Sequence, residues 1–200
     1  MKSTMYRLLL FFLIAFNYVF SQNMKHDYNK ALDCFFNEDY ICAREYFDNF
    51  LNKRPSELSS LDEHASYYHF MSALKLYHPD TEFLFNNFLT SYELSNKKIN
   101  AIFFMSQYFF EKKKYLKVVD LLSDINLYQL ERDKKSHAFF YLGYSAFSIN
   151  KFELSKNCFF ELLFIYGDDK LNFSSMLKVM TSENLLIILF NGSIRATSTL

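Results

Sequence analysis

Residues 136–166 read SHAFFYLGYSAFSINKFELSKNCFFELLFIY, and the spacing of their apolar side chains decides the fold. In each half, apolar or small residues recur every three or four positions, which is the spacing of one helical face. The first set is Ala138, Phe139, Leu142, Ala146 and Phe147, and the second is Phe152, Ser155, Phe159, Leu162 and Leu163. The stretch therefore predicts two amphipathic helices joined by a turn at residues 149–151.

The composition favours helices throughout the chain. Half of the 200 residues are hydrophobic, which is enough for one domain with its own core. Glycine occurs three times and proline twice, few for a sheet-rich fold with many tight turns. We therefore expect an all-α protein in which the many Phe and Tyr rings, at helical spacing, are mainly core residues.

The charges are balanced, with 22 Lys and Arg residues against 22 Asp and Glu residues. Their signs are interspersed, and the longest run of like charge, at residues 112–114, fits a solvated turn between helices. No basic stripe is present in the sequence. We therefore expect neither nucleic acid nor an anionic membrane surface as a partner.

The first 22 residues have the pattern of a secretory signal peptide. Lys2 and Arg7 precede an apolar stretch at residues 8–20, and the small residue Ser21 follows it. The apolar stretch is shorter than the roughly 20 residues of a membrane-spanning helix. The sequence thus predicts a signal peptide at residues 1–21, cleavage after Ser21, and an exported, periplasmic or envelope-associated protein without a stable membrane span.

Three cysteines follow this segment, namely Cys34, Cys42 and Cys158. An odd number at wide spacing is not a disulfide framework, although an exported chain can oxidise one pair. Cys34 and Cys42 are expected on opposite arms of the first hairpin. Each cysteine also lies near an apolar helical face, where a buried free thiol is common. Both alternatives are compatible with the sequence.

An internal repeat connects the hairpin at residues 136–166 to the rest of the chain. The aromatic that opens its second helix, Phe152, has counterparts at Tyr40, Tyr77 and Tyr115, with separations of 37, 38 and 37 residues (77−40, 115−77, 152−115). A fixed period of this length is typical of stacked helical repeats. Two further columns follow at three and seven residues after each aromatic: Ala43, Asp80, Val118 and Ser155, and then Phe47, Leu84, Leu122 and Phe159.

These units resemble the tetratricopeptide repeat, in which an aromatic and a Leu-Gly pair in one helix are followed by Ala and Phe in the next. The fourth unit carries Phe139, Leu142, Gly143, Ala146 and Phe159; the first has Ala31, Cys34, Ala43, Phe47 and Pro55; the third has Ile102, Met105, Ser106, Phe109 and Leu122. The second unit departs most from the pattern. The resemblance implies an α-solenoid of about four stacked hairpins over residues 24–169, with Gly143, Ser106 and Ala31 where paired helices meet.

Residues 170–200 break the repeat. Lys170, Lys178, Glu183 and Arg195 are the charged residues of this tail, and its last residues, NGSIRATSTL, lack an apolar stripe. One interpretation is a fragment of a longer repeat protein whose reading frame was lost near residue 170. The other is a last helix at residues 173–190 that covers the end of the stack.

The sequence contains no motif for catalysis or for a cofactor. Its three glycines form no phosphate loop, and neither a H-E-x-x-H nor a G-x-S-x-G pattern occurs. His64 and His69 are five residues apart and fall on different helical faces, which argues against a zinc site. We therefore expect a non-enzymatic protein with no catalytic residue, no metal and no cofactor.

A partner-binding groove is expected on the first helices of the units, which line the concave wall of such a stack. Its candidate residues are mostly aromatic and suit an apolar or extended segment of a partner protein. The alternative is that these rings pack against neighbouring units or the tail. The candidates are Phe103, Gln107, Phe110, His137, Phe140, Tyr144 and Phe147.

Together these features predict an exported protein-interaction scaffold that resembles exported tetratricopeptide proteins of Bacteroidetes bacteria. An outer-membrane or envelope assembly factor is one alternative, although no cysteine for a lipid anchor follows the apolar segment. A hydrolase is the other, but no motif suggests its substrate. The sequence leaves the partner, the process and any self-association open.

Overall fold

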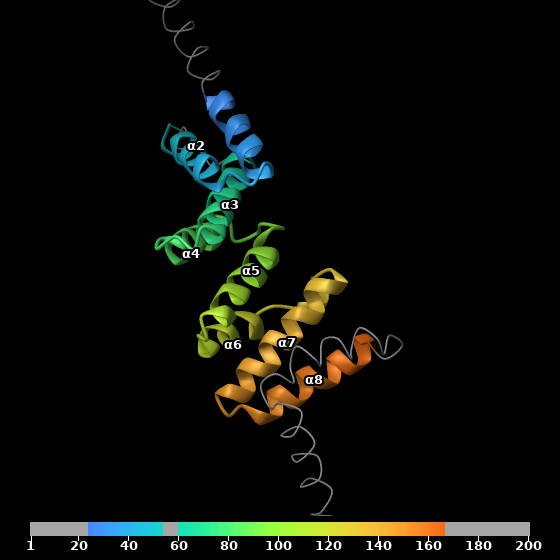
Figure 1. The fold of residues 1–200 in the computed structure, drawn as a ribbon. Helices are drawn as coiled ribbons and strands as arrows, with labels where there is room; N and C mark the ends of the chain where they lie inside the picture. Colours follow the sequence, from blue (N-terminus) through green and yellow to red (C-terminus); the bar gives the residue numbers. More distant parts are fainter. Residues whose placement is uncertain (1–23, 54–59, 167–200) are drawn as a thin grey trace, which may run out of the picture. The chain divides into compact units, whose positions relative to one another are not determined.

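The structure is a computed structural model that describes residues 24–53 and 60–166. All regular elements in these two ranges are helices, as Figure 1 shows, which confirms the all-α prediction. The signal peptide with its cleavage site and the tail at residues 170–200 lie outside the described residues. The elements are a helix at residues 24–36, α2 (Tyr40–Lys53), α3 (Ser60–Lys75), α4 (Thr81–Ser91), α5 (Lys98–Glu111), α6 (Tyr115–Ser123), the 3-10 turn η1 (Leu127–Gln129), α7 (Arg132–Ser148) and α8 (Phe152–Tyr166).

The chain forms two compact units that divide between Tyr108 and Phe109, within α5. In the first unit, α3 packs against both α2 and α4. In the second unit, α7 packs against α6, η1 and α8. Consecutive helices thus form the contacts within each unit. In residues 24–53 and 60–166, no helix has the length and apolar character that a membrane crossing requires.

One turn geometry ends the first helix of every hairpin. The second residue after that helix has a left-handed backbone, and the next N–H donates to the carbonyl oxygen five residues earlier, at 2.8 to 2.9 Å. This is the Schellman arrangement that satisfies the last carbonyl groups of a helix. It confirms the predicted turn at residues 149–151. The left-handed residues are Glu38, Tyr77, Lys113 and Asn150, with φ values of 62°, 51°, 56° and 63°.

In the second repeat unit, the turn and the start of the second helix lie at other positions than the sequence period predicts. Tyr77 occupies the left-handed turn position and is exposed, whereas Tyr40, Tyr115 and Phe152 each begin a helix. The turn before α4 is longer than the other three, and α4 begins only at Thr81, after Pro79. A proline disfavours a helical conformation in the residue before it, which fits this longer turn.

The predicted buried positions of α4, the second helix of the same repeat unit, are also wrong. Thr81 and Phe85 of α4 are buried, whereas Asp80 and Leu84, expected there, are only partly buried. The buried positions of α4 thus lie one residue later than expected. The first buried column is therefore Ala43, Thr81, Val118 and Ser155, with separations of 38, 37 and 37 residues (81−43, 118−81, 155−118).

The core of the first hairpin joins the helix at residues 24–36 to α2 and α3. Ala31 is fully buried in it, beside Phe47 of α2 and Ala65 of α3. Cys34 and Cys42 form a disulfide across this hairpin. Of the two alternatives for these cysteines, the structure therefore contains the oxidised pair.

In the second unit, α7 and α8 approach most closely at Gly143. A Cβ atom there would lie 3.0 Å from Cβ of Cys158 and 3.3 Å from Cζ of Phe159. Gly143 thus lies where the paired helices meet, as expected. The inner face of α8 differs from the prediction, because Phe152 and Leu163 are exposed. The buried residues of α8 are Ser155, Cys158 and Leu162. Cys158 and Leu162 follow Ser155 by three and seven positions, so the three residues share one helical face, which packs against α7.

Candidate functional site

The seven predicted groove residues differ in burial. His137 is exposed, and Phe103 is buried. Phe103 and Gln107 belong to the first unit, whereas the other candidates belong to the second. Five of the seven candidates therefore belong to the second compact unit: Phe110, His137, Phe140, Tyr144 and Phe147. The partly buried candidates are Gln107, Phe110, Phe140, Tyr144 and Phe147.

Five rings of the second unit form what we call the aromatic cluster: Phe110, Tyr115, Phe140, Tyr141 and Tyr144. The ring centroid of Phe110 lies 5.7 Å from that of Phe140, 4.7 Å from that of Tyr141 and 5.3 Å from that of Tyr144. The ring of Tyr115 lies 5.6 Å from that of Tyr144. These are the tilted and edge-to-face distances at which aromatic pairs attract. All five rings are only partly buried, so the cluster has an accessible face.

Helix ends and helical spacing bring these rings together. Phe110 lies in the last turn of α5, and Tyr115 is the first residue of α6. Phe140 and Tyr144 are four residues apart on α7, which places them on one face. Burial, and then the negative charge of Glu111, raise the pKa of the Tyr141 phenol, which therefore stays neutral at physiological pH.

The two remaining candidates in the second unit contact other rings. The centroid of His137 lies 6.1 Å from that of Tyr141, and the centroid of Phe147 lies 5.7 Å from that of Phe152. His137 thus adjoins the aromatic cluster on α7. Phe147 instead contacts α8, so its ring helps to join the two arms of the last hairpin.

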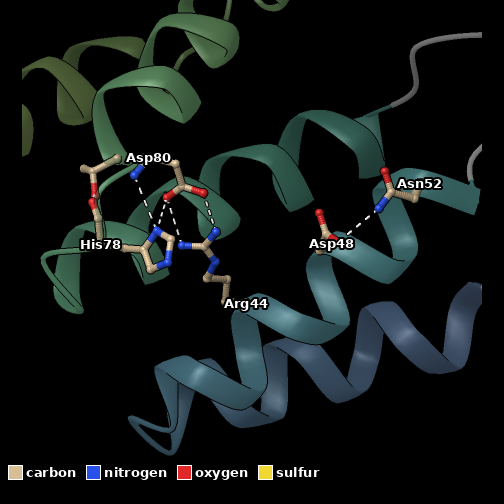
Figure 2. A network of polar contacts seen from close by, with 6 residues as sticks. Arg44, Asp48, Asn52, His78 and Asp80 are labelled. Atoms are coloured by element: carbon tan, nitrogen blue, oxygen red, sulfur yellow. Dashed lines mark hydrogen bonds and ion pairs between the residues drawn. The ribbon is translucent and has the colours of Figure 1, made fainter.

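A polar network in the first unit connects α2 to the turn before α4. Figure 2 shows the guanidinium group of Arg44 facing the carboxylate of Asp80, to which it donates two hydrogen bonds, one of 2.9 Å. His78 Nδ1 lies 2.5 Å from the same carboxylate. Partial burial works to raise the pKa of Asp80, but the hydrogen bonds and charges of Arg44 and His78 outweigh it and lower that pKa. The network therefore links two hairpins through charge-assisted hydrogen bonds.

His69 of α3 is a buried histidine near this network. Its Nε2 atom has no hydrogen-bond partner among the described residues. Burial lowers the pKa of His69; the charge of Asp48 opposes this effect and that of Arg44 adds to it. The imidazole is therefore neutral at physiological pH.

Sequence reasoning missed a pocket of about 480 Å³ in the first unit. The hydroxyl of Tyr28 lies 2.8 Å from Nδ1 of His64 at its wall, and Ser95 Oγ donates a 2.7 Å hydrogen bond to Glu63. Tyr28 and His64 are 36 residues apart, close to one repeat period. Polar residues one period apart were therefore a usable signal, since stacked repeats place them side by side.

The described residues contain no group of three or more His, Cys, Asp or Glu side chains with the geometry of a metal site. Comparisons with protein-family models, with curated proteins and with solved structures gave no match. The function must therefore be argued from the site alone.

Proposed function

We propose that this protein is a non-enzymatic interaction scaffold of the bacterial envelope that binds an apolar, extended segment of a partner protein on the aromatic cluster. The observation that carries the proposal is the accessible face formed by Phe110, Phe140 and Tyr144. Clustered Tyr and Phe rings supply most of the binding energy at many protein interfaces, because they bury a large area at low entropic cost.

The proposal includes a stack of four tetratricopeptide-like hairpins and export by a signal peptide cleaved after Ser21. Two observations support the stack: the same turn in all four hairpins, and the buried column at separations of 38, 37 and 37 residues. The Cys34–Cys42 disulfide supports export, because such bonds persist in oxidising compartments.

Photo-crosslinking in the source cells tests this function. A photoreactive phenylalanine replaces Phe140 in one variant and Phe160, an exposed ring on α8, in the control. We expect position 140 to capture a distinct envelope protein, which then binds the purified scaffold, and position 160 not to capture it. Capture of only a second copy of the chain, or the same capture from both positions, would contradict the proposal.

A further inference from the structure

The pocket in the first unit has the size of a small-molecule site. Its volume of about 480 Å³ lies within the range of roughly 300 to 1,000 Å³ that is usual for such sites. Its wall is formed by the start of α3, by Tyr28 from the first helix, and by the segment between α4 and α5. Three separate parts of the first unit thus meet at one open pocket.

Hydrogen-bond donors are available at this wall. Burial, and then the neighbouring Tyr68, raise the pKa of Tyr28, so its phenol stays protonated and shares a hydrogen bond with Nδ1 of His64. In the tautomer with the ring proton on Nε2, the phenol donates to Nδ1 and the imidazole N–H can donate to a ligand. Lys97 adds an ammonium group to the lining. The acidic residue of the pocket, Glu63, accepts the hydrogen bond from Ser95.

Lys97 and Glu63 bring one positive and one negative charge to the lining. Burial lowers the pKa of His64 most, the positive charge of Lys97 lowers it further, and Glu63 opposes with a smaller effect. A ligand group with a negative charge would be stabilised beside the ammonium of Lys97.

Apolar surface lies beside the donors. Leu61 is 48% exposed and Leu94 is fully exposed, and both line the pocket. Exposed leucine side chains next to a polar wall suit a ligand with an apolar body and one charged end.

We propose that this pocket binds a small organic carboxylate, with the carboxylate on Lys97 and His64 and the apolar body against Leu61 and Leu94. This site is separate from the aromatic cluster and independent of the scaffold function. Its ligand class follows from the donors and the apolar surface together, since Ser95 already donates to the carboxylate of Glu63, and a purely apolar ligand would leave the donors unsatisfied.

Titration of the purified protein with phenylbutyrate and with phenylbutanol, followed by calorimetry and by amide NMR shifts, tests the proposal. The two probes share an apolar body and differ in charge. We expect phenylbutyrate to bind about tenfold or more tightly than phenylbutanol, with shift changes centred on residues 61–64 and 94–97. Equal affinities, or no saturable binding of phenylbutyrate, would overturn the proposal.

Two variants locate the charge. Lys97→Met keeps the apolar stem of the side chain and removes the ammonium, so we expect it to weaken phenylbutyrate binding about tenfold and to leave phenylbutanol unaffected. The control is Lys75→Met, at an exposed lysine of α3 outside the pocket. An affinity for phenylbutyrate that is the same in both variants would also overturn the proposal.

Discussion

Arg44 of α2 donates two hydrogen bonds to Asp80, 36 residues further along the chain and just before α4. Both side chains are partly buried, at 22% and 31% exposure, so water screens this pair less than a pair on the open surface. The bond connects the second helix of one hairpin to the turn of the next. It therefore contributes to the contact between hairpins rather than to either hairpin alone.

A double-mutant cycle with Arg44→Ala and Asp80→Ala measures this contribution. We expect a coupling free energy of unfolding of about 1 kcal/mol, since a two-bond Arg–carboxylate pair exceeds an ordinary surface pair. Urea denaturation of the four proteins gives the value. The control is Lys156 with Glu153, 3.5 Å apart and well exposed, for which we expect almost no coupling. Similar coupling in both pairs would mean that the Arg44–Asp80 pair has no special role.

Replacement of Gly143 tests the close approach of α7 and α8. In Gly143→Leu the added side chain meets Cβ of Cys158 and the ring of Phe159. We expect the free energy of unfolding to fall by about 1 to 3 kcal/mol through overpacking. Lys156→Leu, at an exposed position of α8, is the control and should change it by less than about 0.5 kcal/mol. Identical melting curves for these two variants would refute the packing of the last hairpin.

Thiol labelling tests the state of the three cysteines. Cys34 and Cys42 are bonded, and burial, with a smaller effect of Glu161, raises the pKa of the Cys158 thiol to about 12. The thiolate is the reactive form, so Cys158 should resist alkylation in the native protein. Mass spectrometry should find no added label on native protein, one after denaturation, and three after denaturation with reduction. Three labels without reductant would exclude the disulfide.

The stability of the protein should fall below about pH 6.5, the ordinary pKa of histidine. The folded state lowers the pKa of His69 and of His64, so the unfolded chain binds more protons as the pH decreases. The pH dependence of urea unfolding measures this loss. In His69→Met the loss should be smaller over the same interval, whereas His26→Met, at an exposed histidine, should match the wild type. An unchanged slope in His69→Met would show that His69 is not buried in its neutral form.

The local structure was largely predictable from the sequence. The helices and the turn at residues 149–151 follow from apolar spacing, and Gly143 follows from the small column that close helices require, whereas the buried face of α8 differs because Phe152 and Leu163 are exposed. The error in the second repeat unit has a local cause. Tyr77 matches the period of the repeat, but it lies in the turn before α4, which is lengthened near Pro79.

Contacts between hairpins were less accessible to sequence reasoning. The pocket at His64 and the Arg44–Asp80 pair depend on which faces of successive hairpins meet, and helical periodicity within one element does not specify that. The aromatic cluster was predicted only in part. Phe110, Phe140 and Tyr144 were predicted as groove residues, whereas Tyr115 and Tyr141 were missed, although their rings contact those of Phe110, Tyr144 and Phe140.

The affinity of the crosslinked envelope protein for the purified scaffold tests the central claim most directly. We expect Phe140→Ala to raise the dissociation constant about 30-fold, the loss of an interface hot spot, with the helical circular dichroism unchanged. The exposed ring of α8 is the control, and Phe160→Ala should change the dissociation constant less than about twofold. Equal dissociation constants for the two variants would contradict binding on the aromatic cluster.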